Sequence, residues 1–328
     1  MGRKSLVLTA IRTTNQEDFK HMSVFVIGSL NIDTIYDVRH FVKPGETLSC
    51  SSVEQFPGGK GLNQAIAAAR AGSQVRMAGC IGQDGLFLKE TLEAEGIDTS
   101  MIRIDPDLPS GRAVVQRNPE GGNCILLSRG SNHAITEEMI EEWLENAKPN
   151  DYLLLQNEIS SLDKLLSLAK KKKLNVLFNP APMSDNIKKM KFGFLDCLIV
   201  NENEARDLLE EDRDHSEFIL PLLYDILGCP VLMTRGGQGA DYFSDSQRWF
   251  IPVFPADVKD TTGAGDTFTG VFAACRDQGM NVMDALTRAA AAASICTEKS
   301  GAAQASPFMD EVEERISKCS EVHVLPRL

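Results

Sequence analysis

The chain has 328 residues, of which 43% are hydrophobic and 24% are charged, and its formal net charge is −12. This composition is that of a globular protein with a full apolar core, and it excludes a largely disordered chain. The acidic balance argues against nucleic acid or an anionic membrane as the main partner, and no apolar run approaches the roughly 20 residues that span a bilayer. A small-molecule ligand fits better.

The eight cysteines are scattered, without a CxxC pair or a Cys/His cluster, which argues against a zinc site. Several lie inside apolar runs, as buried reduced thiols do, so we expect a cytoplasmic protein. Residues 1–22 lack the apolar core of a secretory signal. We treat them as an N-terminal extension, disordered or non-native, and expect one domain over residues 23–328.

Strand and helix signals alternate along the chain. Continuous β-branched apolar runs predict buried parallel strands at 24–30, 75–81, 152–156, 175–179, 197–200 and 231–234. Helical patterns lie between them, at 62–71, 86–95, 136–147, 162–172 and 202–210. This order predicts an α/β fold with a mostly parallel sheet.

Two segments break the alternation. Residues 41–53 and 111–128 contain Pro-Gly and Gly-Gly turns and resemble short strands rather than helices. We expect them to form a small β-sheet lid, from about 34–53 and 111–128, over the carboxyl edge of the main sheet.

Polar residues follow the predicted strands, where parallel sheets bind ligands. Asn31 and Asp33 come after the first strand with a spacing of two, so an extended chain points both side chains the same way, toward vicinal hydroxyls. An Asx turn is the alternative. Glu158 follows the strand at 152–156 and by itself would indicate nothing.

A glycine-rich turn, Gly58-Gly59-Lys60-Gly61-Leu62-Asn63, opens the next helix. Its spacing is not that of a P-loop. Glycines here permit close approach of a polyhydroxylated ligand, and Lys60 and Asn63 can donate hydrogen bonds to it. A plain helix-entry turn is the alternative.

Two further strand ends carry candidate nucleotide groups. Asn201 and Glu204 have the spacing of a helix capping box, and the same oxygens suit hydrated Mg²⁺. The amide-rich turn after the strand at 231–234 suits nucleotide phosphates, with a simple hairpin turn as the alternative. Its residues are Thr234, Arg235, Gly236, Gly237, Gln238 and Gly239.

The most informative stretch is Asp260-Thr-Thr-Gly-Ala-Gly-Asp-Thr-Phe268, which an apolar helical run follows. Gly263, Ala264 and Gly265 place free N–H groups at a helix start, where an anion binds. Asp266 adds a carboxylate beside that anion hole. We interpret it as a catalytic base next to a phosphoryl group.

These motifs together resemble the ribokinase-type, or PfkB-family, sugar kinases. The resemblance runs from about residue 24 to 307 and rests on Gly58-Gly59-Lys60-Gly61 with Asn63-Gln64, and on the stretch from Asp260 to Asp266. The segments Asn31-Ile-Asp33, Leu155-Gln-Asn-Glu158 and Asn179-Pro-Ala-Pro182 resemble the ribokinase branch most. The resemblance implies the three-layer ribokinase-like fold, with helices on both faces of the sheet, and a dimer formed through the β-lid.

The resemblance also implies roles for individual residues. Those that would hold the sugar are Asn31, Asp33, Gly59, Lys60, Asn63, Glu158 and Asp266. ATP would contact residues 234–239, Asn201 and Gly265, while Asn201 and Glu204 would order Mg²⁺ through water. A monovalent cation, usually K⁺, would lie near Asp260, the Thr262 carbonyl, Cys296, Gly301 and Ala305. Here the chain departs from the family, because Ala305 stands where a serine is expected and Ser306 follows it.

The predicted activity is ATP-dependent phosphorylation of the primary hydroxyl of a pentose, D-ribose to D-ribose 5-phosphate. The alternatives are a kinase of deoxyribose, of a nucleoside or of a sugar phosphate. A non-catalytic sugar sensor on the same scaffold is a further alternative, although a sensor has no need of a base such as Asp266.

Overall fold

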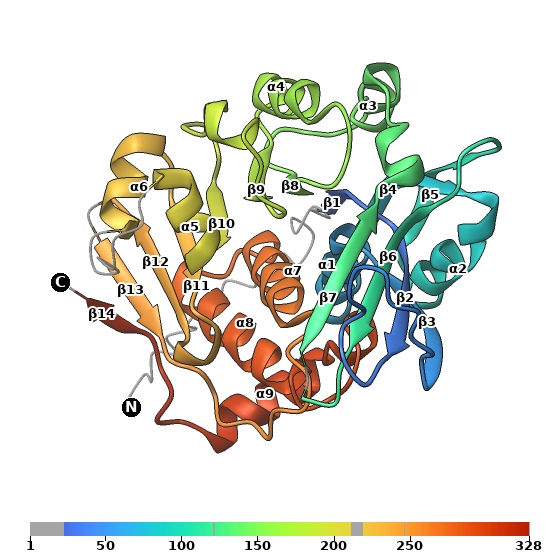
Figure 1. Cartoon of the computed structure of the whole chain (residues 1–328). Coiled ribbons are helices and arrows are strands. Elements are labelled where there is room, and N and C mark those ends of the chain that lie inside the picture. The colour runs from blue at the N-terminus through green and yellow to red at the C-terminus, as the bar shows by residue number, and fades with distance from the viewer. Residues whose placement is uncertain (1–22, 121, 211–218, 246, 328) are drawn as a thin grey trace, which may run out of the picture.

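The computed structural model describes residues 23–120, 122–210, 219–245 and 247–327, so the expected extension at 1–22 lies outside the described residues. A ten-stranded sheet runs through the molecule in the order β14-β13-β12-β11-β10-β9-β8-β1-β4-β5 (Figure 1). The strands from β5 to β11 are parallel and β12 to β14 are antiparallel, which confirms the mostly parallel sheet. The strands are β1 (Val24–Ile27), β4 (Val75–Gly82), β5 (Asp98–Asp105), β8 (Tyr152–Gln156), β9 (Asn175–Asn179), β10 (Cys197–Asn201), β11 (Val231–Thr234), β12 (Ala240–Ser244), β13 (Gln247–Ile251) and β14 (Leu325–Arg327).

Helices cover both faces of this sheet, which confirms the three layers. Alternate residues of β1 enter opposite cores: Val24 and Val26 pack on one side, and Phe25 and Ile27 on the other. One face carries α1 (Lys60–Arg70), α2 (Leu86–Ala94), α7 (Ala264–Asp277), α8 (Val282–Cys296) and α9 (Met309–Lys318); the other carries α3 (Glu137–Trp143), α4 (Leu162–Lys172), α5 (Glu202–Leu209) and α6 (Ile219–Leu227). Among the described residues, no helix combines the length and apolarity needed to cross a bilayer.

A separate four-stranded sheet, the lid sheet, has the order β3-β2-β6-β7. Its strands are β2 (Asn31–Asp37), β3 (Ser52–Gly58), β6 (Gly111–Arg117) and β7 (Asn123–Ser128). The prediction at 111–128 is confirmed. The prediction of a strand within 41–53 is wrong, because most of that segment is a loop and pairing resumes only at Ser52, opposite Asp37.

The first predicted strand is also shorter than expected. It ends at Ile27 rather than at residue 30, because the chain turns at Gly28 and Asn31 already belongs to the lid sheet. A side chain at Gly28 would lie 2.8 Å from the Gly61 Cα, so the turn and the start of α1 are in backbone contact. This contact brings the segment with Asn31 and Asp33 directly against the glycine-rich turn at 58–63.

Helices α1 and α7 pack closely along their length. A Cβ at Gly270 would lie 2.4 Å from the Gln64 carbonyl oxygen and 2.6 Å from the Ala67 Cβ, so the helices meet where α7 has no side chain. The alanine-rich face of α1 allows the same approach from its side. As a result, residues 60–64 lie beside residues 264–266.

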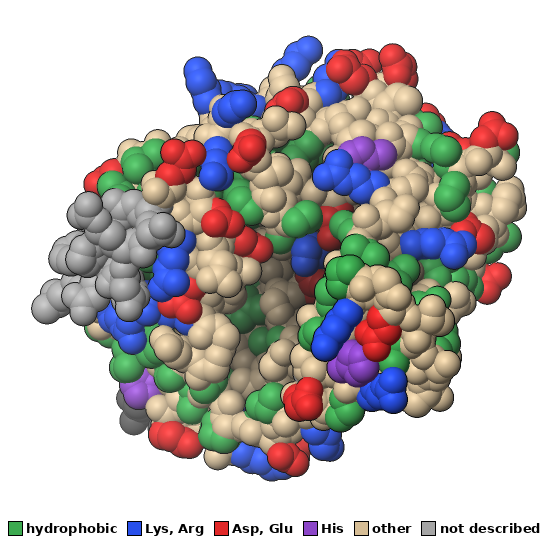
Figure 2. All heavy atoms as spheres, in the orientation of Figure 1, with side chains coloured by type: hydrophobic (Ala, Val, Ile, Leu, Met, Phe, Trp, Pro, Cys, Tyr) green, Lys and Arg blue, Asp and Glu red, His purple; other side chains and the backbone are tan. Residues whose placement is uncertain are grey.

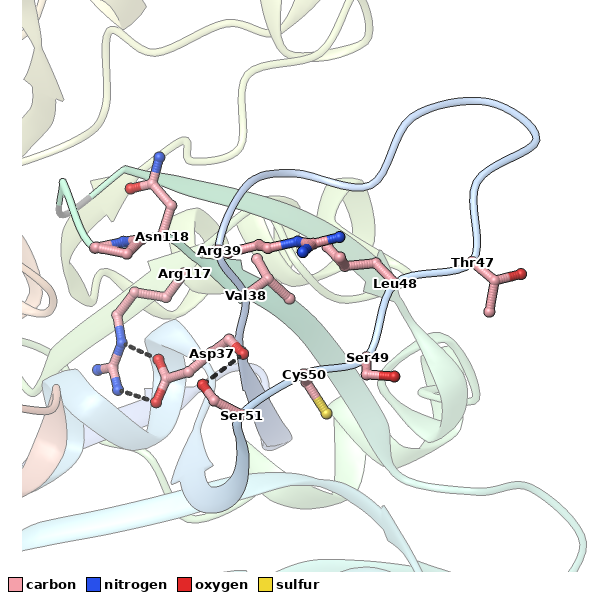
Figure 3. Close-up of a pocket in the computed structure, with 11 residues that line it drawn as sticks. Asp37, Val38, Arg39, Thr47, Leu48, Ser49, Cys50, Ser51, Arg117 and Asn118 are labelled. Atoms are coloured by element: carbon pink, nitrogen blue, oxygen red, sulfur yellow. Dashed lines mark hydrogen bonds and ion pairs between the residues drawn. The ribbon is translucent and has the colours of Figure 1, made fainter.

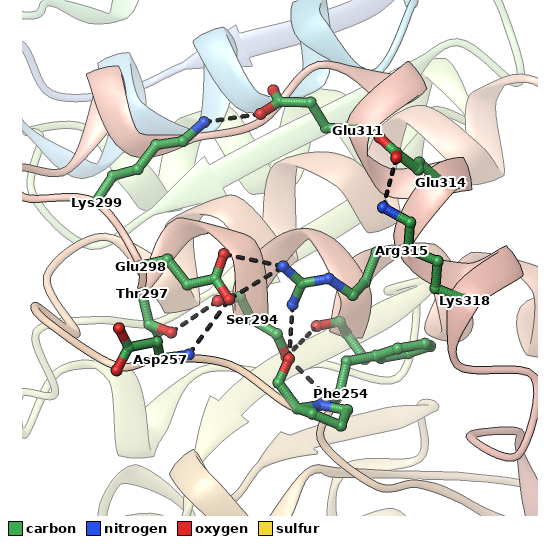
Figure 4. A network of polar contacts seen from close by, with 12 residues as sticks. Phe254, Asp257, Ser294, Thr297, Glu298, Lys299, Glu311, Glu314, Arg315 and Lys318 are labelled. Atoms are coloured by element: carbon green, nitrogen blue, oxygen red, sulfur yellow. Dashed lines mark hydrogen bonds and ion pairs between the residues drawn. The ribbon is translucent and has the colours of Figure 1, made fainter.

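A polar network holds the segment that leads to Asp260 (Figure 4). Arg315 of α9 donates to the Pro255 carbonyl at 2.7 Å and to both carboxylate oxygens of Glu298 at 2.9 and 3.0 Å. Glu298 in turn accepts from the Asp257 amide at 3.3 Å. The loop before α7 is therefore fixed against the ends of α8 and α9.

Candidate active site

The carboxylate of Asp266 lies in the first turn of α7, and each of its oxygens has one amide donor from α1. Asn63 Nδ2 donates to Oδ2 at 2.9 Å, and Gln64 Nε2 donates to Oδ1 at 2.9 Å. Two fixed donors set the orientation of the carboxylate plane. The prediction that Asn63 and Asp266 belong to one site agrees with this contact, whereas their roles in it stay predictions.

A second layer of amides fixes Gln64 itself. Gln64 Oε1 accepts from Gln156 Nε2 at 2.7 Å, and Gln64 Nε2 also donates to Asn179 Oδ1 at 3.3 Å. Asn179 Nδ2 donates to the Ile199 carbonyl at 2.9 Å. The ends of β8 and β9, with the Ile199 carbonyl in the middle of β10, thus orient Asp266 through Gln64. Sequence reasoning did not assign Gln64, Gln156 or Asn179 to the site. The available signal was a polar pair, Asn63-Gln64, inside an alanine-rich helix.

The start of α7 has room in front of it for an anion. Gly263 precedes the helix with φ 76°, a conformation that favours glycine, and a Cβ there would lie 2.6 Å from the Ala302 Cα. The Ala264 amide hydrogen-bonds the Thr261 carbonyl at 3.3 Å, while a Cβ at Gly265 would meet open space. The first-turn N–H groups of a helix have no intrahelical partner, so this end can take negative charge.

Lys60 lies among the acidic groups of the site. The charge of Asp266, with a contribution from Glu158, raises the pKa of Lys60 although burial lowers it. The Lys60 amide donates to Glu158 Oε2 at 3.3 Å, and the Ser29 hydroxyl donates to the same oxygen. Burial raises the pKa of Glu158. The structure thus brings Lys60, Glu158 and Asp266 together, as the sequence predicted, and adds Ser29.

Asp33 points into the same cluster from the lid sheet. Burial raises the pKa of Asp33 to about 7, and the charges of Glu158 and Asp266 act in the same direction while Lys60 opposes them. Its Oδ1 is buried without a hydrogen-bond partner. A buried carboxyl oxygen without a donor is costly, so a ligand that donates a hydroxyl there would relieve the cost.

The start of β2, two residues before Asp33, is held by Asn132 in the short helical turn Gly130–His133. Asn31 Oδ1 accepts from Asn132 Nδ2 at 2.8 Å, and Asn132 Oδ1 accepts from the Leu30 amide at 3.0 Å. Asn63 Oδ1 is a further buried oxygen without a hydrogen-bond partner. The site therefore offers unused acceptors at Asp33 and Asn63, which suits a ligand with several hydroxyl groups.

Asn201 and Glu204 form the capping box that was the alternative interpretation. Asn201 Oδ1 accepts from the Glu204 amide, and Glu204 Oε2 accepts from the Asn201 amide, both at 2.9 Å. Burial raises the pKa of Glu204, and the negative charge of Asp266 adds to it. A buried carboxylate near further negative charge suits a hydrated Mg²⁺, so the capping box and a metal role are compatible. Among the residues described, no group of three or more His, Cys, Asp or Glu side chains forms a metal cluster.

The turn at 234–239 joins β11 to the antiparallel strand β12, so it is a hairpin connection as well as a candidate phosphate turn. The Arg235 amide donates to the Gly239 carbonyl at 2.8 Å. A Cβ at Gly236 or Gly237 would meet nothing within 4 Å, which leaves open space above the turn. Its contact with ATP stays a prediction.

Several of the predicted cation residues contact one another in and around the loop before α7. Asp260 accepts from the Thr262 amide at 2.9 Å and from the Gly301 amide at 3.1 Å, and these bonds outweigh burial and lower its pKa. Cys296 Sγ lies 3.9 Å from the Thr262 carbonyl oxygen. Ala305 supplies no side-chain oxygen, but the adjacent Ser306 hydroxyl is buried without a hydrogen-bond partner. Such an orphaned oxygen fits a cation ligand.

The face above this cluster is hollowed between the lid sheet and the β10–β11 side of the molecule (Figure 2). A different cavity of about 780 Å³ lies under the loop that joins β2 to β3 (Figure 3). Arg117 and Asp37 form a two-bonded ion pair in its wall, at 2.7 and 3.1 Å. The second cavity is lined by lid residues and does not contain the Asp266 cluster.

Comparisons with known proteins identify a family. A model described as pfkB family carbohydrate kinase matches residues 22–309. Ribokinase from Bacillus subtilis (strain 168) is 34% identical over 299 residues, 90% of this chain and 99% of that protein. Deoxyribokinase from Salmonella typhi is 31% identical over 304 residues, with 90% and 99% covered. The solved structure of Arabidopsis thaliana ribokinase complexed with ribose and ATP has a TM-score of 0.79 at 29% identity, with 90% and 98% covered.

Proposed function

The chain belongs to the pfkB family of carbohydrate kinases, and from that premise we propose that it transfers the γ-phosphoryl group of ATP to the primary hydroxyl of a pentose, D-ribose to D-ribose 5-phosphate. The observation that carries the proposal is the Asp266 carboxylate, oriented by Asn63 and Gln64 at the start of α7. A carboxylate aligned beside a helix N-terminus suits proton removal next to a transferring phosphoryl group.

In the proposed reaction, the sugar O5 attacks the γ-phosphorus and Asp266 takes the O5 proton. The bond from the γ-phosphorus to the β,γ-bridging oxygen breaks, and ADP leaves with the electron pair. The N–H groups of Gly263, Ala264 and Gly265 would receive the negative charge on the γ-phosphoryl oxygens, Ala264 in exchange for its 3.3 Å hydrogen bond to the Thr261 carbonyl. The amide chain through Gln64 keeps the base in position without itself reacting.

ATP would lie between α7 and the β11–β12 turn. Residues 234–239, with Asn201 and Gly265, would contact the nucleotide, and Glu204 with Asn201 would hold Mg²⁺ through its waters. When bound, Mg²⁺ supplies positive charge to the phosphates. The charges of Asp266 and Glu158 raise the pKa of Lys60, so its ammonium group would be available to stabilise the same phosphate charge.

The sugar would lie under the lid sheet. Asp33, Asn63 and Asn31 would hold its hydroxyls, with Gly59 and Glu158 in the wall, because the first two have buried oxygens that need donors. Closure of the lid would exclude water, the competing phosphoryl acceptor. We further propose one kinase domain over 23–328, in the cytoplasm.

The exposed edge strand β7 of the lid suits a second copy of the chain. Ile125, Leu126 and Leu127 on β7 are 54%, 68% and 41% exposed. Three neighbouring exposed aliphatic residues on an edge strand favour association. We therefore propose a homodimer through the lid sheet.

A monovalent cation, K⁺, is proposed as an activator. Asp260, the Thr262 carbonyl, Cys296, Gly301 and the segment at Ala305 would surround it, with the Ser306 hydroxyl in place of the expected serine. The cation would add positive charge behind the anion hole. Stimulation of turnover by K⁺ but not by Li⁺ would support this site.

Deoxyribose is the second candidate acceptor, because the chain is 31% identical to a deoxyribokinase. Ribose and 2-deoxyribose differ by one hydroxyl, and a site that pairs a buried carboxylate with that hydroxyl discriminates strongly against its absence. Asp33, with an unpaired buried oxygen, favours the sugar that has the extra donor.

The decisive experiment is an acceptor panel with ATP. Ribose, 2-deoxyribose, adenosine and fructose 6-phosphate are compared by ADP release, and the product phosphate is located by ³¹P NMR. The proposal expects the highest kcat/KM for ribose and a 5-phosphate product. A higher kcat/KM for another acceptor would replace ribose, and absence of sugar-dependent ADP release would overturn the kinase assignment.

A further inference from the structure

A buried ion-pair cluster lies directly behind the β11–β12 turn. Its centre is Asp241 on β12, whose side chain is 0% exposed. Arg235 Nε lies 2.7 Å from Oδ2, Arg248 Nε lies 2.9 Å from Oδ1, and Arg327 reaches Oδ1 at 3.6 Å. One carboxylate therefore joins the candidate phosphate turn, strand β13 and the C-terminal strand β14.

Arg235 connects this cluster to the turn through both its backbone and its side chain. Its amide donates to the Gly239 carbonyl at 2.8 Å, and its carbonyl accepts from the Gln238 amide at 3.0 Å. Its side chain is only 8% exposed and reaches Asp241, where the Nε–H is not aligned with Oδ2, so the contact is an ion pair rather than an ideal hydrogen bond. The base of the turn is thus attached to the sheet.

The middle of the turn, at Gly236 and Gly237, has little packing of its own, whereas Gly239 at its end packs against Ile251. A side chain added at Gly236 or Gly237 would meet nothing within 4 Å. Glycines lose more conformational freedom than other residues on being ordered. The ordered conformation of the turn in the absence of a ligand must then come from its two ends, and Arg235 forms one of them.

Resting on the proposed kinase function, we propose that Arg235 is a positioning residue that preorganises the nucleotide turn through Asp241, and that its guanidinium does not contact ATP. A turn that is already ordered binds ATP more tightly, because the loss of conformational entropy on ordering the turn does not occur during binding. The buried carboxylate holds the guanidinium away from the open space above the glycines. The sequence-based expectation of a direct Arg235 contact would be replaced by an indirect role.

Arg248 provides a matched control within the same cluster. It contacts the other oxygen of Asp241 and is also 8% exposed, but it lies on β13, outside the turn. Removing either guanidinium weakens the same buried ion-pair cluster. Only Arg235 should affect the turn.

The test compares Arg235→Gln, Asp241→Asn and Arg248→Gln by calorimetric titration with Mg-ATP, well below each variant's Tm. We expect Arg235→Gln and Asp241→Asn each to weaken ATP binding about tenfold, with less than about a twofold change in the KM for the sugar. Arg248→Gln should lower Tm and change ATP affinity less than about twofold. The double variant Arg235→Gln/Asp241→Asn should be no weaker than either single one.

Two outcomes would overturn the inference. If Asp241→Asn binds ATP as well as the wild type while Arg235→Gln does not, Arg235 contacts ATP directly. If Arg248→Gln weakens ATP binding as much as Arg235→Gln, the cluster is only a stabilising one. Amide hydrogen exchange of the peptide over 234–240 is read without ATP, and unchanged exchange in Arg235→Gln would also refute preorganisation. Wild-type protein that binds no Mg-ATP would instead refute the proposed function.

Discussion

The floor of the site and the lid sheet are built in opposite ways. On the floor, Asp266 is held by two amides, and one of these, Gln64, is itself held by two further side chains. In the lid, β7 is exposed along its whole length and carries three consecutive exposed aliphatic residues. Side-chain hydrogen bonds are therefore concentrated around Asp266, whereas exposed aliphatic surface is concentrated on the outer strand of the lid sheet.

The difference between the two regions suits two different functions, namely precise placement of Asp266 and covering of the sugar. The proposed base, Asp266, lies on packed helices with a supporting layer of hydrogen bonds, and precise placement of this kind is what proton transfer requires. A cover must admit and release its ligand, so it is attached to the core by few contacts and exposes groups that a partner can bury. Changes to the floor should affect turnover, and changes to the lid should affect sugar affinity and assembly.

The largest effect is expected on the floor. Asp266→Asn keeps the shape and removes the base, so kcat should fall about 10²- to 10⁴-fold while ATP and sugar affinities change little. Asp277→Asn is the matched control, because Asp277 is also buried but lies at the other end of α7, bonded to Ser73. Steady-state kinetics of both variants measure the effect, and near-normal turnover in Asp266→Asn would show that Asp266 is not the base.

A smaller effect is expected where the lid meets the floor. Asp33→Ala should raise the KM for the sugar about 10- to 100-fold, the value of a hydrogen bond to a charged group, and leave the KM for ATP unchanged. Asp37→Ala, at the outer end of the same strand and paired with Arg117, should change neither. Equal loss of sugar and ATP affinity in Asp33→Ala would show that Asp33 is structural.

The pH dependence of sugar binding sharpens the role of Asp33. Burial raises its pKa to about 7, so the free protein loses the ionised acceptor as the pH falls through that value. The KM for the sugar should therefore rise about tenfold between pH 8 and pH 6. In Asp33→Asn the dependence should disappear at a weaker, constant KM, and a wild-type profile in that variant would assign the titration to another group.

The smallest effect on turnover is expected at the outer lid. Leu126→Glu places a charge in the proposed dimer interface and should weaken the dimer about tenfold or more, because a buried aliphatic side chain contributes about 1.5–3 kcal/mol. Ile226→Glu on α6, also highly exposed at 62%, is the control. Sedimentation equilibrium measures both, and an unchanged mass for Leu126→Glu would move the interface elsewhere or leave the protein monomeric.

The parts of the site that sequence reasoning located are local motifs. The start of α7 with Asp266, the ends of β8, β10 and β11, and most parallel strands each depend on a continuous run of residues. Such runs carry their own signal in apolar β-branched strands and glycine-rich helix starts. The mostly parallel sheet and the lid hairpin at 111–128 were predicted for this reason.

The parts that it missed depend on contacts between distant segments. Gln64 joins Gln156 and Asn179 across 92 and 115 residues of sequence, so only the folded chain brings their amides together. The strand predicted at 24–30 is divided at Gly28, because the start of α1 packs against that turn. The loop at 38–51 has the composition of a hairpin but finds no neighbouring strand to pair with until residue 52.

The distance between helices α1 and α7 depends on the absence of a side chain at Gly270. Gly270 lies one helical turn after Asp266, on the face that touches Gln64 and Ala67. Any larger residue there would push α7 away from α1 and separate Asp266 from both of its amide donors, Asn63 and Gln64. Substitutions that change the acceptor sugar should therefore be tolerated in the lid sheet. Substitutions at the contact between α1 and α7 should not be, because they would change the position of Asp266.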